Sequence, residues 1–405
     1  MTRYAVALMI MAAALTAAPE VTLGAAAGGL TTESSAIGRL IGGQDALLAA
    51  DPGGNAVLSI HADRMLVPAS TLKILTALVA RHYLGEGFRF KTEIYLDSRK
   101  NLTVKGFGDP LLISEVFREI AQKTSDRVSA VHDLFVDGSY FEEVTIPGVS
   151  DTLNPYDAPC GALSVNFNTV NFRRSGNRYV SAEAQTPIIP FILGRIQQSG
   201  LRAERIVLSA ENGEATLYAG HLFRRFLVNA GVRCTGGVAT GAVRSGRDRL
   251  VYRHISKFSL DEVIERLLMY SNNFMANQLL IAAGIAAYGP PGTLDKGVAA
   301  ANAYVRDTLK RNDIRIAEGS GISRRNRLTA ACMMKILEAF APHHELMRQE
   351  GGVYYKTGSL SGVRTRAGYV RGIDGELSPF VLLMNTPGKH PDAVMPKLAR
   401  LLRIR

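Results

Sequence analysis

The sequence predicts an α+β fold, in which helices near two short polar motifs accompany an antiparallel sheet close to the C-terminus. One observation is an apolar run that starts after Pro68 and meets no proline or glycine until Gly85, which is typical of a buried helix. The other is a set of three strand-like runs at 353–355, 363–370 and 379–384, each bounded by turn residues. This spacing predicts three antiparallel strands of one sheet.

The first helix begins near a serine and a lysine that share one of its faces. Ser70 and Lys73 are three positions apart, about one helical turn. A serine hydroxyl is a poor nucleophile and needs a base within hydrogen-bond reach. A lysine among apolar neighbours loses solvation of its ammonium, so its pKa falls and the neutral amine can act as that base. We therefore expect Ser70 to be a nucleophile, Lys73 its base, and the free N–H groups of the helix start to favour an oxyanion.

A second polar motif follows a helix with a clear start signal. Ser259 and Glu262 have the spacing of a capping box, and apolar residues at helical spacing come next. Ser271 and Asn273 lie at the end of that helix. We expect Ser271 to relay a proton between Lys73 and a leaving amine, and Asn273 to hydrogen-bond a substrate amide.

The third motif follows the first of the predicted C-terminal strands. Lys356 and Thr357 supply a cation and a hydroxyl donor for a substrate carboxylate. Gly358 has no side chain, so a peptide can lie against the strand and pair with it.

Each motif alone is weak, because a solvated helix start, a polar turn and a strand end would give the same letters. In this order, however, they are the residue set of the penicillin-recognising serine enzymes. The segments 105–110, 156–159, 162–168 and 318–324 extend the likeness over nearly the whole chain after the leader. The chain thus resembles the low-molecular-mass class C penicillin-binding proteins, the D-alanyl-D-alanine carboxypeptidase/endopeptidase family.

The resemblance implies a split penicillin-binding transpeptidase-like (serine β-lactamase-like) domain, with an antiparallel sheet flanked by helices. Its two parts would span residues 28–97 and 255–405, and a β-rich insertion would span 98–254. Ser70 and Ser271 are 201 positions apart (271 − 70), and such a long gap is the family's hallmark.

The resemblance also implies further contacts. The N–H groups of Ser70 and Ser359 would form the oxyanion hole, and the Ser359 hydroxyl would share the carboxylate. In the insertion, Asp137 and Phe141 lie in a stretch resembling one that touches the stem peptide in relatives. Arg324, beside the Gly-Ser-Gly loop, is placed to face acidic substrate groups.

Two positions depart from the family pattern. Asn272 stands where aspartate is usual, and Ser361 stands where a relative known for endopeptidase action carries glutamine.

The expected function is cleavage of D-alanyl peptide bonds in peptidoglycan stem peptides through a Ser70 acyl-enzyme, with β-lactam antibiotics as covalent inhibitors. Carboxypeptidase and endopeptidase action both stay open. A serine β-lactamase is one alternative, although the sequence identifies no deacylating glutamate. A non-catalytic penicillin- or peptidoglycan-binding module is another, although a pure binder needs no nucleophile.

Composition narrows the partners. The 405 residues carry a net charge of +11, which indicates either a generally basic surface or attraction to anionic envelope polymer. Residues 397–405 predict a helix packed on the sheet, with a membrane-surface element as the alternative. Tryptophan is absent and no nucleic-acid-binding module is recognised. No sequence motif for a metal or cofactor is present, so we expect neither.

Residues 1–27 have the pattern of a secretory signal peptide, with an uncleaved anchor as the alternative. The expected location is therefore the periplasm or cell envelope of a bacterium, with at most peripheral membrane association. Of three cysteines at least one must be free, and Cys332 is expected to be a buried thiol. Cys160 and Cys234 either pair or stay reduced, and the second reading is favoured.

Overall fold

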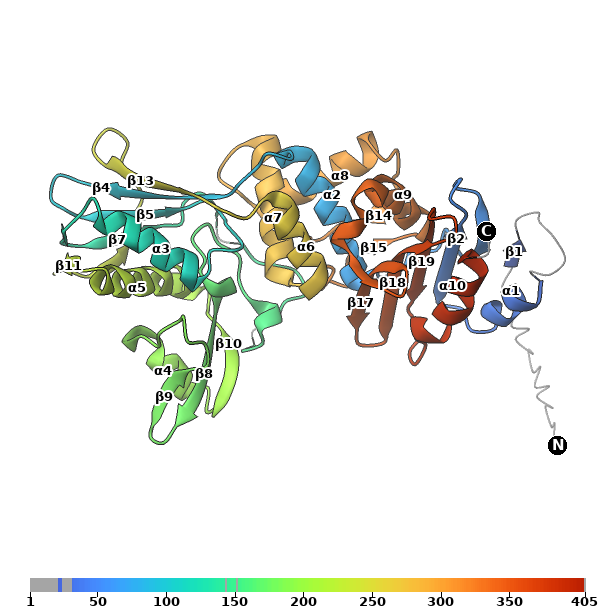
Figure 1. Ribbon diagram of the computed structural model, residues 1–405, viewed down its shortest axis with the longest axis horizontal. Helices are drawn as coiled ribbons and strands as arrows, with labels where there is room; N and C mark the ends of the chain where they lie inside the picture. The colour runs from blue at the N-terminus through green and yellow to red at the C-terminus, as the bar shows by residue number, and fades with distance from the viewer. Residues whose placement is uncertain (1–20, 24–30, 143, 151, 404–405) are drawn as a thin grey trace, which may run out of the picture.

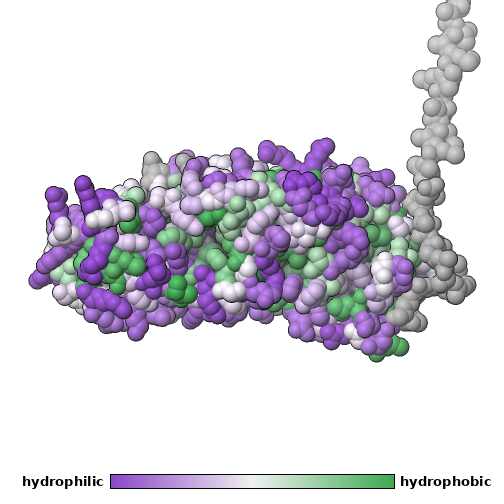
Figure 2. Space-filling view, turned by 90° about the horizontal axis from the view of Figure 1, so that it is seen from above, coloured by the Kyte–Doolittle hydropathy of each residue, from purple (hydrophilic) through white to green (hydrophobic). Residues whose placement is uncertain are grey.

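The structure is a computed structural model that describes residues 21–23, 31–142, 144–150 and 152–403. It forms an elongated molecule with one sheet-and-helix body at each end and helices α2, α6 and α7 near its middle (Figure 1). On the face shown in Figure 2, polar residues predominate and apolar residues lie in small separate groups. No helix in the described part of the chain is both long enough and apolar enough to cross a bilayer.

The C-terminal body is built on a seven-stranded sheet in which every neighbouring pair is antiparallel. In order across the sheet, its strands are β1 (Val21–Leu23), β3 (Ala56–Ile60), β2 (Asp45–Ala50), β19 (Leu377–Met384), β18 (Val363–Arg371), β17 (Val353–Leu360) and β16 (Arg348–Glu350). The three C-terminal strands predicted from the sequence are confirmed as β17, β18 and β19. Strand β19 pairs with β2, so residues from both ends of the chain complete one sheet.

Helices cover both faces of this sheet. The helices of this body are α1 (Thr31–Gly38), α2 (Lys73–Leu84), α6 (Leu260–Tyr270), α7 (Asn273–Tyr288), α8 (Leu294–Asp307), α9 (Ala330–Phe340) and α10 (Met395–Arg403). Alternate residues of β19 point to opposite faces, with Leu382 packed among residues of α1 and α10 and Leu383 in the core with α2, α7 and α9. Leu398 and Leu402 of α10 are fully buried. The tail therefore packs on the sheet as predicted.

The N-terminal leader is largely outside the described residues. Only Val21–Leu23 of the predicted signal peptide is described, and it pairs with β3 at the edge of the sheet.

The second body contains most of the residues that the sequence reading placed in the insertion, and it keeps that name here. Its five-stranded sheet contains, in order, β12 (Val238–Thr240), β7 (Leu134–Asp137), β5 (Leu102–Gly106), β4 (Lys91–Leu96) and β13 (Arg249–Ile255). Helices α3 (Ser114–Ser125) and α5 (Glu214–Asn229) share an apolar core with this sheet. The remaining strands and helix of the insertion are β6 (Ala130–Val131), β8 (Thr169–Ser175), β9 (Arg178–Ser181), α4 (Pro190–Gln198), β10 (Ala203–Val207) and β11 (Arg233–Cys234).

The pairing of β4 moves one predicted boundary. The sequence reading placed residues 28–97 in the catalytic domain, but β4 pairs with β5 and β13 in the sheet of the insertion. The chain enters this sheet at Lys91 and leaves it at Ile255. The division into a split domain and an insertion stays a prediction, now with its first boundary before β4.

Candidate active site

The turn that carries Ser70 is held in an unusual backbone conformation. Residues Ala69–Leu72 form one 3-10 turn that continues into α2 at Lys73. Ala69 has a φ of 48°, which a non-glycine residue adopts only where its surroundings impose it. The hydroxyl of Thr365 on β18 donates to the Pro68 carbonyl at 2.7 Å and fixes the entry to the turn. The turn is therefore held by the sheet.

Lys73 lies directly behind the serine and is completely buried. Its Nζ is 2.9 Å from Ser70 Oγ, 2.9 Å from Asn273 Oδ1 and 2.7 Å from the Ser320 carbonyl oxygen. Burial lowers the pKa of Lys73 well below its usual value; the nearby Lys356 lowers it further, and Glu318 opposes the change. This is the geometry and the pKa direction that an amine needs to take a proton from a serine.

The Ser-x-Asn motif lies where α6 passes into α7. The capping box at Ser259 and Glu262 is confirmed, with both reciprocal bonds present. Ser271 ends α6 in a left-handed conformation, and the Asn272 side chain accepts from the Met275 N–H at 2.9 Å as the cap of α7. Asparagine and aspartate both suit that cap, which explains why either stands at this position.

The Lys-Thr-Gly motif lies on β17, which runs beside the Ser70 turn. A Cβ placed on Gly358 would be 2.8 Å from the amide nitrogen of Ser70, so only glycine allows this approach. Thr357 and Ser359 are exposed on one side of the strand, whereas Lys356 is buried and donates to the Thr357 carbonyl at 2.8 Å. Burial lowers the pKa of Lys356 to about 8.

Most of the predicted residues meet at one cavity of about 820 Å³. Ser70, Ser271, Asn273, Thr357 and Ser359 line it. Lys73, Lys356 and Gly358 are buried. Lys73 donates to Ser70, and Gly358 packs against the turn that carries Ser70. The charge of Lys356 lowers the pKa of Lys73. The exposed Arg324 side chain donates to the carbonyl of Ser361, another lining residue.

Residues of the segment 148–157, within the predicted insertion, also line the cavity. They are Gly148, Ser150, Thr152, Asn154, Tyr156 and Asp157. Tyr156 is 61 % exposed, and its carbonyl oxygen is 3.5 Å from the Asn273 amide nitrogen. The sequence reading quoted Tyr156 and Asp157 only as part of the family likeness and missed their place at the site.

Asp137 and Phe141 are not among the residues that line this cavity. The Asp137 carboxylate is buried and pairs with Lys105 at 3.1 Å, and it accepts from Ser139 and from the Val243 N–H. Phe141 is buried in the apolar core. Asp137 is held within the second body and Phe141 packs against the core of the C-terminal body, so neither side chain faces this cavity. Their contact with substrate stays a prediction.

The three cysteines are free thiols, and Cys160 and Cys332 are buried. Burial raises the pKa of Cys332 to about 12, so this thiol stays protonated. Among the residues that the structure describes, no group of three His, Cys, Asp or Glu side chains is arranged to hold a metal ion.

A split sheet-and-helix domain that gathers a serine, a buried lysine and the two later motifs at one cavity defines the class of serine acyl-enzymes. Residues 39–199 and 191–349 match the D-Ala-D-Ala carboxypeptidase 3 (S13) family, and the chain belongs to that family. It is thus a serine-type D-alanyl-D-alanine carboxypeptidase, a hydrolase.

Individual relatives agree with this family. The chain is 27 % identical over 426 residues to the D-alanyl-D-alanine carboxypeptidase of Actinomadura sp. (strain R39), covering 85 % of this chain and 78 % of the relative. Penicillin binding protein 4 of Haemophilus influenzae superposes with a TM-score of 0.73 at 20 % identity, over 92 % of this chain and 98 % of that one. A predatory endopeptidase of Bdellovibrio bacteriovorus has a TM-score of 0.54 at 16 % identity, over 89 % and 93 % of the two chains. The two structural matches show that the fold is shared.

Proposed function

We propose that Ser70 attacks the carbonyl carbon of a D-alanyl peptide bond while Lys73 takes its proton. The observation that carries this proposal is the 2.9 Å contact between a fully buried lysine amine and the Ser70 hydroxyl, at the edge of an open cavity. A bond forms between Ser70 Oγ and the carbonyl carbon, the C–N bond breaks, and the proton passes through Ser271 to the leaving amine. Water then hydrolyses the ester and frees the serine.

The other motif residues have binding roles in this proposal. Asn273 binds the amide of the substrate, and Lys356 with Thr357 binds the carboxylate that follows the cleaved bond. The N–H groups of Ser70 and Ser359 stabilise the oxyanion, which the close approach of β17 to the Ser70 turn supports.

The leaving amine decides between two activities. Release of a terminal D-alanine is carboxypeptidase action, and release of a side-chain amine of a neighbouring stem peptide is endopeptidase action. We propose both, because a cavity of about 820 Å³ that is also lined by residues 148–157 is large enough for branched peptides. Arg324 at its edge is placed to meet an acidic group of the stem.

β-Lactams would acylate the same serine, as the name of the penicillin binding protein 4 relative suggests. A location in the bacterial envelope, from the predicted leader, completes the proposal. The buried Glu318 carboxylate faces backbone amides, so it offers no base for the fast deacylation that a β-lactamase needs.

Intact-mass measurement after benzylpenicillin tests the proposal. We expect one stable adduct on Ser70 that Ser70→Ala abolishes, together with release of D-alanine or of uncrosslinked stems from purified peptidoglycan. An adduct on another residue would contradict the site. Rapid return of the free mass with hydrolysed penicillin would identify a β-lactamase, and an adduct without any peptidoglycan product would leave only a binding module.

A further inference from the structure

Glu318 is a fully buried carboxylate that has no role in the mechanism above. It lies in the loop between β14 (Ile314–Arg315) and β15 (Arg327–Leu328). Its two oxygens accept five hydrogen bonds from nitrogen donors, namely Ser320 N (2.6 Å), Asn277 Nδ2 (3.1 Å), Gly321 N (2.7 Å), Asn326 Nδ2 (2.6 Å) and Ser323 N (3.3 Å). Every neighbour is a donor, so the site suits a carboxylate and no neutral side chain of the same shape.

The loop that Glu318 holds contacts the elements that carry the site. The Ser320 carbonyl accepts from Lys73 Nζ at 2.7 Å, and the Gly319 carbonyl accepts from the Thr76 hydroxyl of α2 at 2.6 Å. The Gly319 N–H donates to Asn277 of α7 at 2.7 Å. The loop therefore fixes one of the three acceptors of Lys73 and ties α2 to α7.

The charges around Lys73 are few. Lys356 faces it from β17, Glu318 faces it from the loop, and the Cys160 thiol lies near Glu318. Burial, and then the charge of Glu318, raises the pKa of Cys160, which keeps that thiol neutral. The negative charge of Glu318 raises the pKa of Lys73, against the effects of burial and Lys356. Glu318 is thus the negative charge that acts on the buried Lys73 amine.

We propose that Glu318 is a positioning residue for the Ser70 reaction, which holds the Ser320 carbonyl against Lys73 and places a negative charge near the buried Lys73 amine. The inference rests on the proposed function of Ser70 and Lys73. It gives Glu318 two separable effects, one on the geometry of the amine and one on its proton affinity.

Acylation of Ser70 by a fluorescent penicillin, followed against pH, tests the two effects. Glu318→Gln keeps the shape but turns an amide NH₂ toward N–H donors and removes the charge. We expect its plateau rate to fall by about tenfold or more. We expect the acid limb of its pH profile to move to lower pH, because the pKa of Lys73 falls when the negative charge is lost. Lys356→Met should move the acid limb to higher pH, because it removes a positive charge.

Two further variants separate positioning from general damage. Glu318→Asp keeps the charge and both acceptors, so its acid limb should stay in place and its rate should lie within about fivefold of the wild type. Glu93→Gln alters another buried carboxylate, which pairs with Lys91 and Arg253 in the insertion. This control should leave the acid limb unchanged even if the protein is less stable.

An acid limb that stays in place or rises in folded Glu318→Gln would overturn the proposal, as would the same shift in Glu93→Gln. If Glu318→Gln does not fold, Asn326→Ser decides. This change removes one donor from Glu318 and the acceptor of the Ala317 and Glu318 N–H groups, and it leaves the charge. It should slow acylation with an unmoved acid limb, and wild-type rates would overturn the positioning role. Failure of the wild type to be acylated would instead refute the Ser70 proposal itself.

Discussion

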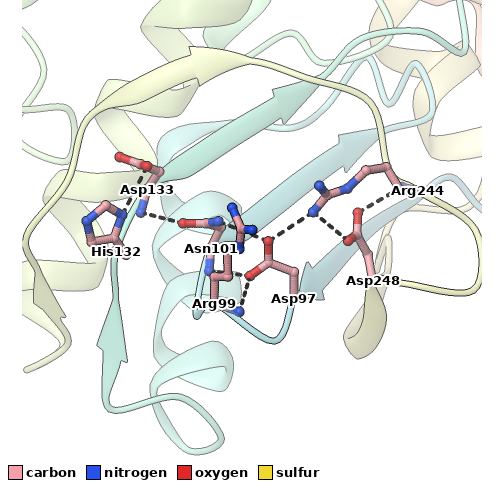
Figure 3. A network of polar contacts seen from close by, with 7 residues as sticks. All are labelled: Asp97, Arg99, Asn101, His132, Asp133, Arg244 and Asp248. Carbon is pink, nitrogen blue, oxygen red and sulfur yellow. Dashed lines mark hydrogen bonds and ion pairs between the residues drawn. The ribbon is translucent and has the colours of Figure 1, made fainter.

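Two polar networks, one in each body, use the same chemistry in different surroundings. In the catalytic body, the Glu318 carboxylate gathers amide donors in a site with no exposed surface. In the insertion, the Asp97 carboxylate accepts from the N–H groups of Arg99 and Asn101 at 2.8 Å and pairs with Arg244 at 2.9 Å (Figure 3). The Arg244 side chain is 54 % exposed and also pairs with Asp248.

The two networks differ in whether water can solvate a charge that has lost its partner. A charge at the surface regains solvation when its partner is removed, so an exposed ion pair contributes little to stability. A buried charge that loses its partner has no such substitute. Substitutions in the catalytic network should therefore change chemistry, and those in the insertion network should change stability by a small amount.

The largest effect is expected for Lys73→Met. This change removes the base but fills the same buried space, so we expect acylation by benzylpenicillin to slow by about 10³-fold, within the usual range for a general base. Stopped-flow or quenched mass measurement gives the rate. A near-normal rate in a folded variant would show that another group accepts the proton. Substitutions in the catalytic network would then not differ from those in the insertion network by their effect on chemistry.

Asp109, near the junction of the two bodies, extends the comparison of carboxylates to one that is buried with too few hydrogen-bond donors. One carboxylate oxygen accepts from the Leu111 N–H at 2.8 Å, and the other has no partner among the described residues. Burial raises the pKa of Asp109 from 3.8 to about 6. The folded protein thus favours the protonated form of the Asp109 carboxyl. The contribution of Asp109 to the free energy of unfolding is fully present below pH 4 and is lost as the pH rises to about 6.

In Asp109→Asn this loss should disappear. We expect the wild-type free energy of unfolding to fall between pH 4 and pH 6 by an amount on the order of 3 kcal/mol, and the variant to lack that part of the fall. Urea unfolding at several pH values measures it. Parallel curves for both proteins would show that Asp109 is ionised without cost in the folded state.

Thr357→Val tests the exposed side of the catalytic network. The hydroxyl faces the cavity and is proposed to donate to the substrate carboxylate, so its loss should matter only when a carboxylate is present. We expect kcat/KM on a D-alanyl-D-alanine peptide to fall by about tenfold, roughly 1.4 kcal/mol, with a much smaller change on an uncharged thioester. Equal losses on both substrates would mean that Thr357 supports acylation in general.

The smallest effect is expected for Arg244→Ala in the insertion. The change breaks two ion pairs of a half-exposed arginine, whose partners Asp97 and Asp248 are 8 % and 3 % exposed but keep backbone N–H donors. The free energy of unfolding should therefore fall by about 1 kcal/mol. Benzylpenicillin acylation should keep its wild-type rate. A large loss of either property would show that the surface network of the insertion supports the catalytic body, and the two regions would not be independent.

The sequence predicted what depends on local pattern. The capping box at Ser259, the strand before Lys356 and the shared face of Ser70 and Lys73 are each encoded within a few residues. The first boundary of the insertion was predicted after residue 97, beyond β4, because a strand looks the same locally whichever sheet it joins. Asp137 and Phe141 were predicted to contact substrate from a resemblance of their stretch to one in relatives, and a resemblance does not show that Asp137 pairs internally with Lys105.

The contacts of Glu318 could not be predicted from the sequence, for another reason. Its partners are mostly backbone N–H groups, and Lys73 is held by the backbone carbonyl of Ser320, so no side-chain identity signals either contact. Only the tertiary fold brings the loop at 318–323 against α2.

The pairing of β2 with β19 also sets the order in which the chain can become active. Strand β2 pairs with β19, which lies more than 300 residues further along the chain. Gly358 of β17 packs against the Ser70 turn, so this contact also joins segments that are far apart in the sequence. Contacts of such long sequence separation form late in folding. A chain that still lacks β17 thus carries Ser70 and Lys73 without the strand that completes their cavity. Hydrolytic activity therefore requires that β17 has been made and has packed against the Ser70 turn.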